Sequence, residues 1–313
     1  MKIFITGGLG YVGTELSHSL SQSGHHITVF DTGWFGNHLP SAPNLEIIIG
    51  DLRSMNVSLE GFDAVIHLAN IANDPGVELN QTLSWEVNVL ATYQLLQRAI
   101  SSGVKAFIYA SSGSVYGISE LDKVDENTPL VPISAYNKTK MIAEQVLLSS
   151  KEKIKVFNIR PATICGFSRR MRLDLAVNLL TFQALTKGEI TILGGKQFRP
   201  NIHIDDMVGV YRHFLRNYAN LESGNYNAGF ENLTIEDITE RICDVVPAKK
   251  IFKESNDDRS YRLDSGKLLA TGFSPEKGID DAICELKLKF ENNELTEKTE
   301  WFTVKTMKQL GLG

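Results

Sequence analysis

The chain begins with a short apolar stretch that runs directly into a glycine turn and then into a helical pattern. Residues 2–6 read Lys-Ile-Phe-Ile-Thr, and residues 7–13 read Gly-Gly-Leu-Gly-Tyr-Val-Gly. In such a unit Gly7 allows the tight turn, Gly10 lets the backbone approach an anion, and Gly13 lets the helix pack close to the strand. The free N–H groups of the helix N-terminus then face the anion. The segment predicts a site for the diphosphate of a dinucleotide.

A carboxylate follows the second apolar stretch, at the position where it would meet the adenosine ribose. Asp31 ends the run that starts at His26, close to the offset of about 20 residues that such a site requires. A carboxylate there repels a 2′-phosphate, and residues 32–37 contain no lysine or arginine to counter it. The sequence therefore predicts NAD as the cofactor rather than NADP.

Composition narrows the class of protein. With 313 residues, 42% of them hydrophobic, the chain can bury a large core. The net charge of −5 and the lack of a basic stripe argue against nucleic acid or an anionic membrane as a partner. No apolar run reaches the roughly 18 residues of a membrane span, and no signal-peptide pattern opens the sequence.

The three cysteines bear on compartment and on metal binding. Cys165, Cys243 and Cys284 lie far apart, without the paired spacing of a metal site, and this usage suits a reducing compartment. We expect a cytoplasmic protein that binds no metal and acts on a small molecule.

Short apolar runs recur along the first half of the chain, with helical stretches between them. Continuous apolar runs are typical of strands that are buried on both faces, so they predict a Rossmann-type, doubly wound parallel sheet. The expected strands cover residues 3–6, 27–31, 45–49, 64–69, 106–111 and 156–160, and the expected helices residues 12–23, 83–101 and 134–150.

The regular alternation fades after Pro161, which indicates a second unit. We expect a helix at residues 173–187, a strand at 190–193, and a return of the chain to the sheet near 204–217 and 226–228. The prediction is a smaller, discontinuous C-terminal substrate-binding domain. Its bounds are about 166–196 and 230–313, which leaves residues 1–165 plus about 197–229 for the nucleotide-binding domain.

An arginine-rich stretch lies near the start of this second unit. Residues 169–172 read Arg-Arg-Met-Arg. The stretch either approaches an anionic substrate or forms a solvated loop.

Tyr136 and Lys140 lie one turn apart on the same face of an expected helix. A second cluster, residues 110–117 (Ala-Ser-Ser-Gly-Ser-Val-Tyr-Gly), directly follows an expected strand. Because the carboxyl ends of parallel strands line the ligand crevice, these serines are predicted to lie beside the cofactor.

Taken together, these motifs resemble the extended short-chain dehydrogenase/reductase family, and within it the NAD-dependent nucleotide-sugar epimerase/dehydratase group. The resemblance covers nearly the whole chain. It rests on Gly7, Gly10 and Gly13; Asp31; Asp51-Leu52; His67-Leu68-Ala69; Asn88-Val89; Ser112 with Val115-Tyr116-Gly117; Tyr136 with Lys140; Arg160-Pro161; Arg199 with Ile202 to Asp206; and Leu269 to Pro275.

The resemblance implies a catalytic role for three residues. Tyr136 is the expected acid and base toward a sugar hydroxyl, and Ser112 is expected to hydrogen-bond the same oxygen. A free tyrosine has a pKa near 10, so this role requires a pKa lower by about three units, on the order of 4 kcal/mol. The ammonium of Lys140 favours the phenolate, and by resemblance it also holds the nicotinamide ribose.

The resemblance also implies which residues contact the two ligands. Asp51 and Leu52 are expected to flank the adenine. The full set expected to bind the cofactor is Gly7, Gly10, Tyr11, Val12, Asp31, Asp51, Leu52, Leu68, Ala69, Asn88, Ser111, Tyr136, Lys140 and Pro161. The set expected to bind a nucleotide-diphosphate sugar is Ser112, Ser114, Asn178, Arg199 and Arg259.

Among the substrate residues, Arg199 aligns with the family's phosphate-binding arginine, whose planar fork matches phosphate oxygens. Asn178 is expected to meet the phosphate or the base. A second arginine of the family pattern has no clear counterpart, and either Arg259 or Arg262 takes its place. His67 and His203 lie on apolar strands and are expected to be packed, hydrogen-bonded side chains.

The expected reaction depends on the two residues directly after Ser112. Family members that expel water from a sugar carry an Asp-Glu pair there, whereas this chain has Gly113 and Ser114. Without that acid and base, dehydration is disfavoured, and the pattern favours a 4-epimerase. An NAD(P)-dependent ketoreductase or dehydratase of a nucleotide sugar is the alternative within the family. A noncatalytic NAD-binding sensor or partner-binding protein is the alternative outside it. The family also implies a homodimer, formed through residues 83–101 and 134–150.

Overall fold

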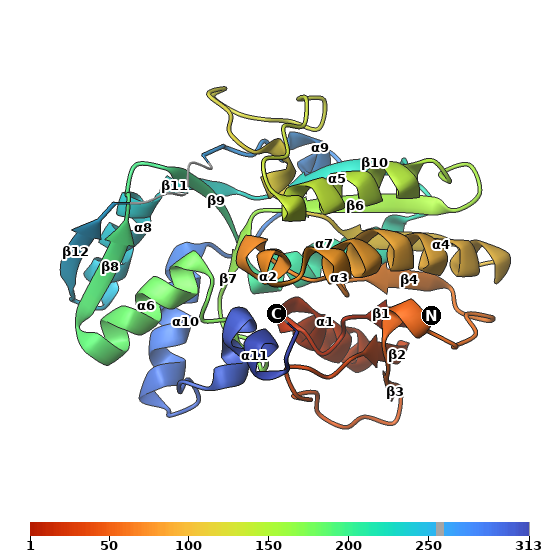
Figure 1. The fold of residues 1–313 in the computed structure, drawn as a ribbon, viewed down its shortest axis with the longest axis horizontal. Helices are drawn as coiled ribbons and strands as arrows, with labels where there is room; N and C mark the ends of the chain where they lie inside the picture. The colour runs from red at the N-terminus through yellow and green to blue at the C-terminus, as the bar shows by residue number, and fades with distance from the viewer. Residues whose placement is uncertain (255–259, 313) are drawn as a thin grey trace.

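A computed structural model describes residues 1–254 and 260–312. Within this part of the chain, seven strands form one parallel sheet in the order β10-β6-β5-β4-β1-β2-β3 (Figure 1). This confirms the predicted doubly wound sheet. Its strands are β1 (Lys2–Thr6), β2 (His26–Asp31), β3 (Leu45–Ile49), β4 (Ala64–His67), β5 (Ala106–Ala110), β6 (Lys155–Pro161) and β10 (Gly224–Ala228).

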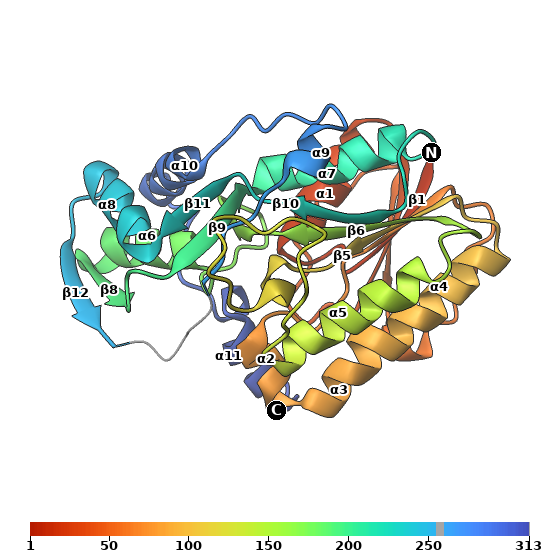
Figure 2. The same ribbon diagram turned by 90° about the horizontal axis from the view of Figure 1, so that it is seen from above.

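Helices cover both faces of this sheet. Successive side chains on a strand point to opposite faces, and the strands carry apolar side chains on both. On β1, Ile3 and Ile5 pack on one face with α1 (Tyr11–Gln22) and α7 (Ile204–Asn217), whereas Phe4 packs on the other with α4 (Thr92–Ser101) and α5 (Ala135–Leu148). Figure 2 shows the two helical layers with the sheet between them.

The helix expected over residues 83–101 is interrupted. It consists of α3 (Gln81–Trp85), a π-helical stretch η2 (Glu86–Ala91) and α4. Asn88, in the π-helical stretch, accepts a hydrogen bond from Ile71 N (2.8 Å) and donates to Thr139 Oγ1 (3.2 Å). The wider turn thus coincides with a buried amide that ties this helix to the loop after β4. None of the helices among the described residues is both long and apolar enough to cross a membrane.

The glycine turn brings two backbone segments unusually close. Gly7 has φ +72°, and a Cβ at this residue would lie 2.5 Å from the backbone nitrogen of Ala69. A Cβ at Gly13 would lie 2.2 Å from the carbonyl oxygen of Gly7. Any larger residue at either position would therefore push α1 away from β1 or β4. Strand β4 ends at His67, two residues earlier than expected, and the chain then passes across the turn.

A second lobe packs at the carboxyl edge of the sheet (Figure 2). It has its own apolar core, in which Val177, Ile190, Ile238 and Ile283 are buried. Its elements are β7 (Thr163–Cys165), α6 (Ala176–Lys187), β8 (Glu189–Leu193), β9 (Phe198–His203), β11 (Glu231–Thr234), α8 (Ile235–Val245), β12 (Lys249–Lys253) and α10 (Ile279–Glu291). The short elements elsewhere are η1 (Leu52–Ser54), α2 (Asp74–Leu79), η3 (Gly113–Tyr116), α9 (Gly266–Leu269), η4 (Thr299–Trp301) and α11 (Thr303–Gln309).

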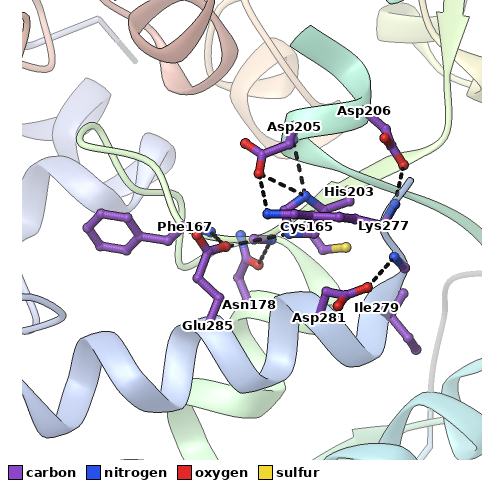
Figure 3. A network of polar contacts seen from close by, with 12 residues as sticks. Cys165, Phe167, Asn178, His203, Asp205, Asp206, Lys277, Ile279, Asp281 and Glu285 are labelled. Carbon is purple, nitrogen blue, oxygen red and sulfur yellow. Dashed lines mark hydrogen bonds and ion pairs between the residues drawn. The ribbon is translucent and has the colours of Figure 1, made fainter. Parts of the chain in front are cut away.

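A polar network joins the two lobes where β9 leads into α7 (Figure 3). Asp206 accepts hydrogen bonds from the backbone nitrogens of Glu276 (2.9 Å) and Lys277 (3.0 Å). Glu285, on α10, accepts one from the backbone nitrogen of Phe167 (3.0 Å). Asp206 thus holds the segment before α10 at the start of α7, and Glu285 holds the segment after β7 against α10.

His67, at the end of β4, is a buried side chain with two threonine partners. Its Nδ1 lies 2.6 Å from Thr6 Oγ1, and its Nε2 lies 2.7 Å from Thr92 Oγ1. Because the Thr92 hydroxyl donates to the carbonyl of Asn88, it accepts from Nε2–H, and Nδ1 accepts from Thr6. Burial, together with the charge of Lys140, lowers the pKa of His67 to about 3.

We expect His67 to make the fold sensitive to acid. Between pH 6.5 and about 3 the unfolded chain binds a proton that the folded chain excludes, so falling pH favours unfolding by about 1.4 kcal/mol per pH unit. His67→Gln, measured by urea unfolding at pH 7, 6 and 5, should show a shallower slope than the wild type. The exposed His26→Gln is the control, and equal slopes for all three proteins would contradict the assignment.

Candidate active site

A cavity of about 750 Å³ opens between the carboxyl edge of the large sheet and the second lobe. Most of the side chains and turns expected to bind a ligand line it, although they come from eight different stretches of the chain. Those that line it are Gly7, Gly10, Tyr11, Val12, Asp31, Asp51, Leu52, Leu68, Ala69, Ser111, Ser112, Ser114, Tyr136, Lys140, Pro161 and Arg199.

At one end of the cavity the start of α1 meets Asp31. The Asp31 carboxylate accepts hydrogen bonds from the backbone nitrogens of Leu9 (3.0 Å) and Gly33 (2.9 Å), which fixes it beside the glycine turn. Burial raises the pKa of Asp31, although these backbone hydrogen bonds oppose the shift. The first N–H groups of α1 have no partner within the helix. The site thus offers donors for a diphosphate and a carboxylate for a ribose, which fits a dinucleotide.

Farther along the cavity, α5 presents Tyr136 and Lys140 one turn apart. Lys140 Nζ donates to the carbonyl of Ala110 (2.6 Å) at the end of β5, and lies 5.8 Å from the centre of the Tyr136 ring. Burial lowers the pKa of Lys140 to about 7, against the pull of the Glu144 carboxylate. A proton on this amine can therefore exchange near neutral pH, directly beside a phenol that lines the cavity.

The serines after β5 face the same part of the cavity. Ser112 Oγ lies 2.7 Å from Ser114 Oγ and accepts a hydrogen bond from the Ser114 backbone nitrogen. Ser114 donates in turn to Asn137 Oδ1 (2.8 Å) on α5. Ser111 donates a hydrogen bond to Glu144. Ser112 is therefore the hydroxyl of this cluster whose proton can turn toward a ligand without breaking a contact with α5.

A buried ion pair ties α5, the helix that carries Tyr136 and Lys140, to β6. Arg160, on β6, binds Glu144 through two hydrogen bonds (Nε–Oε1 2.9 Å, Nη2–Oε2 2.7 Å) and also donates to Tyr116 Oη (2.8 Å). Burial by itself would lower the pKa of Arg160, but the hydrogen bonds and charge of Glu144 outweigh it and leave the pKa raised. Both side chains are about 2% exposed, so water does not screen the pair, and the charge of Glu144 also acts on Lys140.

Two of the expected ligand residues, Asn88 and Asn178, do not line the cavity. Asn88 is buried beneath the loop after β4, which it shapes. Asn178 is also buried and hydrogen-bonds the Gly166 nitrogen (3.0 Å), the Tyr11 hydroxyl (3.0 Å) and the Arg172 carbonyl (3.0 Å). Its polar atoms thus join the two lobes, and a contact with the phosphate or base stays a prediction. Arg259 lies outside the described residues.

The sequence did not reveal the contribution of the C-terminal segment to the cavity. Phe302 to Lys305 and Met307 line it, and Met307 packs in the cluster that contains Ile71, Val77 and Tyr136. Helix α11 follows a segment without a strong periodic pattern, and it is ordered by tertiary packing against α2.

The helix expected over residues 173–187 begins only at Ala176, because the preceding residues follow the cavity wall. Arg172 binds Asp174 there through two hydrogen bonds (2.8 and 3.1 Å), and Asp174 also accepts from the backbone nitrogen of Thr303 (3.2 Å). Residues 169–172 pointed to this part of the site in the sequence. The sequence left open whether they approach an anionic substrate or form a solvated loop.

The fold and the site define a nucleotide-binding enzyme of the extended short-chain dehydrogenase/reductase type. The chain belongs to the NAD dependent epimerase/dehydratase family, whose sequence model matches residues 3–229. Its cofactor is NAD. Bound NAD would contact the glycine turn and Asp31. At the glycine turn a Cβ would collide with the backbone.

Several similar proteins have been described. The UDP-glucose 4-epimerase of Lactobacillus helveticus is 25% identical over 91% of this chain and 95% of that protein. The structure of UDP-glucuronic acid 4-epimerase from Bacillus cereus, in complex with UDP-glucuronic acid and NAD, is 25% identical and has a TM-score of 0.84, covering 94% of this chain and 100% of that chain. A dTDP-glucose 4,6-dehydratase from Streptomyces venezuelae, solved with NAD bound, shares the fold at 22% identity and a TM-score of 0.84, covering 94% and 98%.

We expect removal of the Glu144 charge to destabilise the protein strongly, because Arg160 would remain buried without its anion. Glu144→Gln should lower the free energy of unfolding by about 3–5 kcal/mol, measured by chemical denaturation. The double variant with Arg160→Met should recover part of this loss. Glu294→Gln, which breaks the partly exposed pair with Lys289, should cost no more than about 1 kcal/mol. A similar small loss for Glu144→Gln would refute this view of the pair.

Proposed function

We propose that this protein is an NAD-dependent 4-epimerase of a nucleotide-diphosphate sugar. In such a reaction the sugar is oxidised at carbon 4 to a keto intermediate, which is then reduced from the opposite face. NAD is regenerated in each cycle, so no second redox substrate is consumed. The similar proteins include both 4-epimerases and a dehydratase, so the choice depends on this chain's own residues.

The absence of an acid–base pair beside Ser112 supports epimerisation over dehydration. A Cβ added at Gly113 would lie 3.0 Å from the Pro161 carbonyl oxygen and 3.0 Å from Leu263 Cδ1. This packing leaves little room for a carboxylate side chain. The next residue, Ser114, is engaged with Asn137. Neither position can supply the acid or the base needed to expel water from the sugar.

The residues of the site divide the chemistry among them. Bound NAD would supply the hydride acceptor for oxidation at carbon 4 and the hydride donor for the reduction that follows. Tyr136 removes the proton from the hydroxyl on carbon 4 and gives it back in the reverse step. The charge of Lys140, one turn away, stabilises the phenolate. Ser112 donates a hydrogen bond to the oxygen on which negative charge develops.

The substrate diphosphate is assigned to the side of the cavity formed by the second lobe. Arg199, on β9, lines the cavity there, with Gln197 and Tyr261 nearby. Arg262 stacks on the Phe198 ring at 3.7 Å and is the other described arginine of this region. A guanidinium at Arg199 would match two phosphate oxygens.

The decisive experiment follows product stereochemistry. UDP-, dTDP-, GDP- and CDP-sugars would be incubated with the protein, and the configuration at carbon 4 would be determined by NMR. We expect an epimer to form without accumulation of NADH. Stoichiometric consumption of NADPH would instead identify a ketoreductase, and loss of water from the sugar would identify a dehydratase. Either result would overturn the proposal.

Tyr136→Phe tests the catalytic assignment. Removal of the phenolic hydroxyl should lower kcat by about 10²- to 10⁴-fold, while NAD still binds. Tyr218→Phe, at the end of α7 and away from the cavity, is the matched control and should keep full activity. If Tyr136→Phe keeps its activity, Tyr136 is not the acid–base group; if the function of the protein in the cell also survives the substitution, a noncatalytic NAD-binding role becomes the better explanation.

We also propose that the chain forms a homodimer through residues 83–101 and 134–150, which present the outer faces of α3, η2, α4 and α5. Trp85, Leu90 and Tyr93 expose large apolar side chains on this face (39, 54 and 46% exposed). Clusters of exposed apolar residues commonly mark an interaction surface.

A substitution can test this dimer directly. In sedimentation at micromolar concentration we expect twice the monomer mass for the wild type. Leu90→Glu combined with Tyr93→Glu should give the monomer, because burial of two carboxylates in the interface is costly. A monomeric wild type would reject the proposal.

A further inference from the structure

The stretch of residues 169–172 carries three arginines, and the structure distinguishes one of them from the other two. Arg169 pairs with Glu15 on α1, and Arg172 pairs with Asp174. Arg170, between them, has no hydrogen bond or ion pair with any described residue. Two of the three charges are thus neutralised within the fold, and the third is available to a ligand.

Arg170 is also the most enclosed of the three. Its side chain is 2% exposed, lines the cavity, and lies with its guanidinium carbon 4.0 Å from the centre of the Phe35 ring. Its Nε is buried without a hydrogen-bond partner. Burial, reinforced by the charge of Arg172, lowers the pKa of Arg170 to about 9, so the side chain is still charged at neutral pH. A buried cation without a partner is stabilised when an anion binds to it.

The backbone on the N-terminal side of Arg170 is fixed to the start of α1. Ser168 Oγ donates to the carbonyl of Tyr11 (2.8 Å), and the Arg169 nitrogen donates to Glu15 (2.8 Å). The Tyr11 hydroxyl reaches back to the carbonyl of Gly166 (2.7 Å). Arg170 is therefore held near the helix N-terminus that faces the cofactor diphosphate.

Asp31 does not act as the anion for Arg170. Its charge acts on Arg170, but no ion pair forms between them, and the carboxylate is held by the backbone nitrogens of Leu9 and Gly33. An anion that approached both Arg170 and the N-terminus of α1 would be neutralised from two sides.

We infer that Arg170 binds the diphosphate of NAD from the side opposite α1, so that the second lobe contributes a cationic contact to the cofactor. The guanidinium fork can meet two phosphate oxygens while its face rests on Phe35. The inference rests on the cofactor site and is independent of the proposed reaction at carbon 4. The glycine turn and Asp31 do not explain why residues 169–172 are rich in arginine, and this inference gives that stretch a function.

The test compares ligands that do and do not contain a diphosphate. The full-length protein, freed of copurified cofactor, would be titrated calorimetrically with NAD, ADP, adenosine and UDP. For Arg170→Gln we expect the affinity for NAD and for ADP to fall about 10- to 100-fold, as expected for the loss of a hydrogen-bonded charge pair. Adenosine and UDP should bind as they do to the wild type.

Arg169→Gln is the matched control, since it removes a neighbouring arginine that already has a carboxylate partner, and it should leave the affinity for NAD unchanged. Arg170→Lys keeps the charge but loses the fork, so we expect an intermediate loss of affinity, and this variant replaces Arg170→Gln if the latter fails to fold. In thermal unfolding without ligand, Arg170→Gln should be no less stable than the wild type, whereas its stabilisation by NAD should be smaller.

Other outcomes would overturn the inference. Unchanged affinity for NAD and ADP would exclude a contact with the diphosphate. An equal loss of affinity for adenosine would assign the Arg170 contact to the nucleoside. A loss of affinity confined to UDP would assign the contact to the substrate. Failure of the wild type to bind NAD would instead remove the cofactor on which the proposed function depends. A wild type that binds NAD but forms no epimer would leave the assignment of Arg170 intact.

Discussion

The structure depends on the close approach of α1 to the carboxyl ends of β1 and β4. Gly7 and Gly13 make this approach possible, because a Cβ at either would overlap backbone atoms. The helix N-terminus is thereby held at the mouth of the cavity, and Asp31 is fixed beside it by backbone hydrogen bonds. The other parts of the site are arranged around this fixed anion-binding end.

Buried charges organise the part of the site around α5. Lys140 lies against the end of β5, while Glu144, one turn farther along α5, is bound to Arg160 on β6. Burial disfavours the protonated form of Lys140, and Glu144 partly restores it. This amine can therefore gain or lose a proton near neutral pH, beside the ring of Tyr136. The ion pair thus links the stability of the sheet to the electrostatics of the site.

Contacts between the lobes complete the cavity. Tyr11 on α1 is hydrogen-bonded to Gly166 and Asn178, and Asp174 connects the cavity wall to the C-terminal segment at Thr303. These side chains are conventional hydrogen-bonding residues with no motif of their own. Their importance comes from their position, since each one fixes a segment that carries residues lining the cavity.

The sequence by itself determined the sheet, the glycine turn and the pair on α5, because each depends on local spacing or on continuous apolar runs. It could not determine which arginine of residues 169–172 remains unpaired, nor that Asn178 would bridge the lobes. It also contained no sign that the C-terminal segment would line the cavity. These features depend on which distant side chains meet, such as Glu15 with Arg169, and no local pattern encodes that meeting. Tertiary packing decided them, because the pairing of buried charges and the covering of apolar surfaces are settled only when separate segments come together.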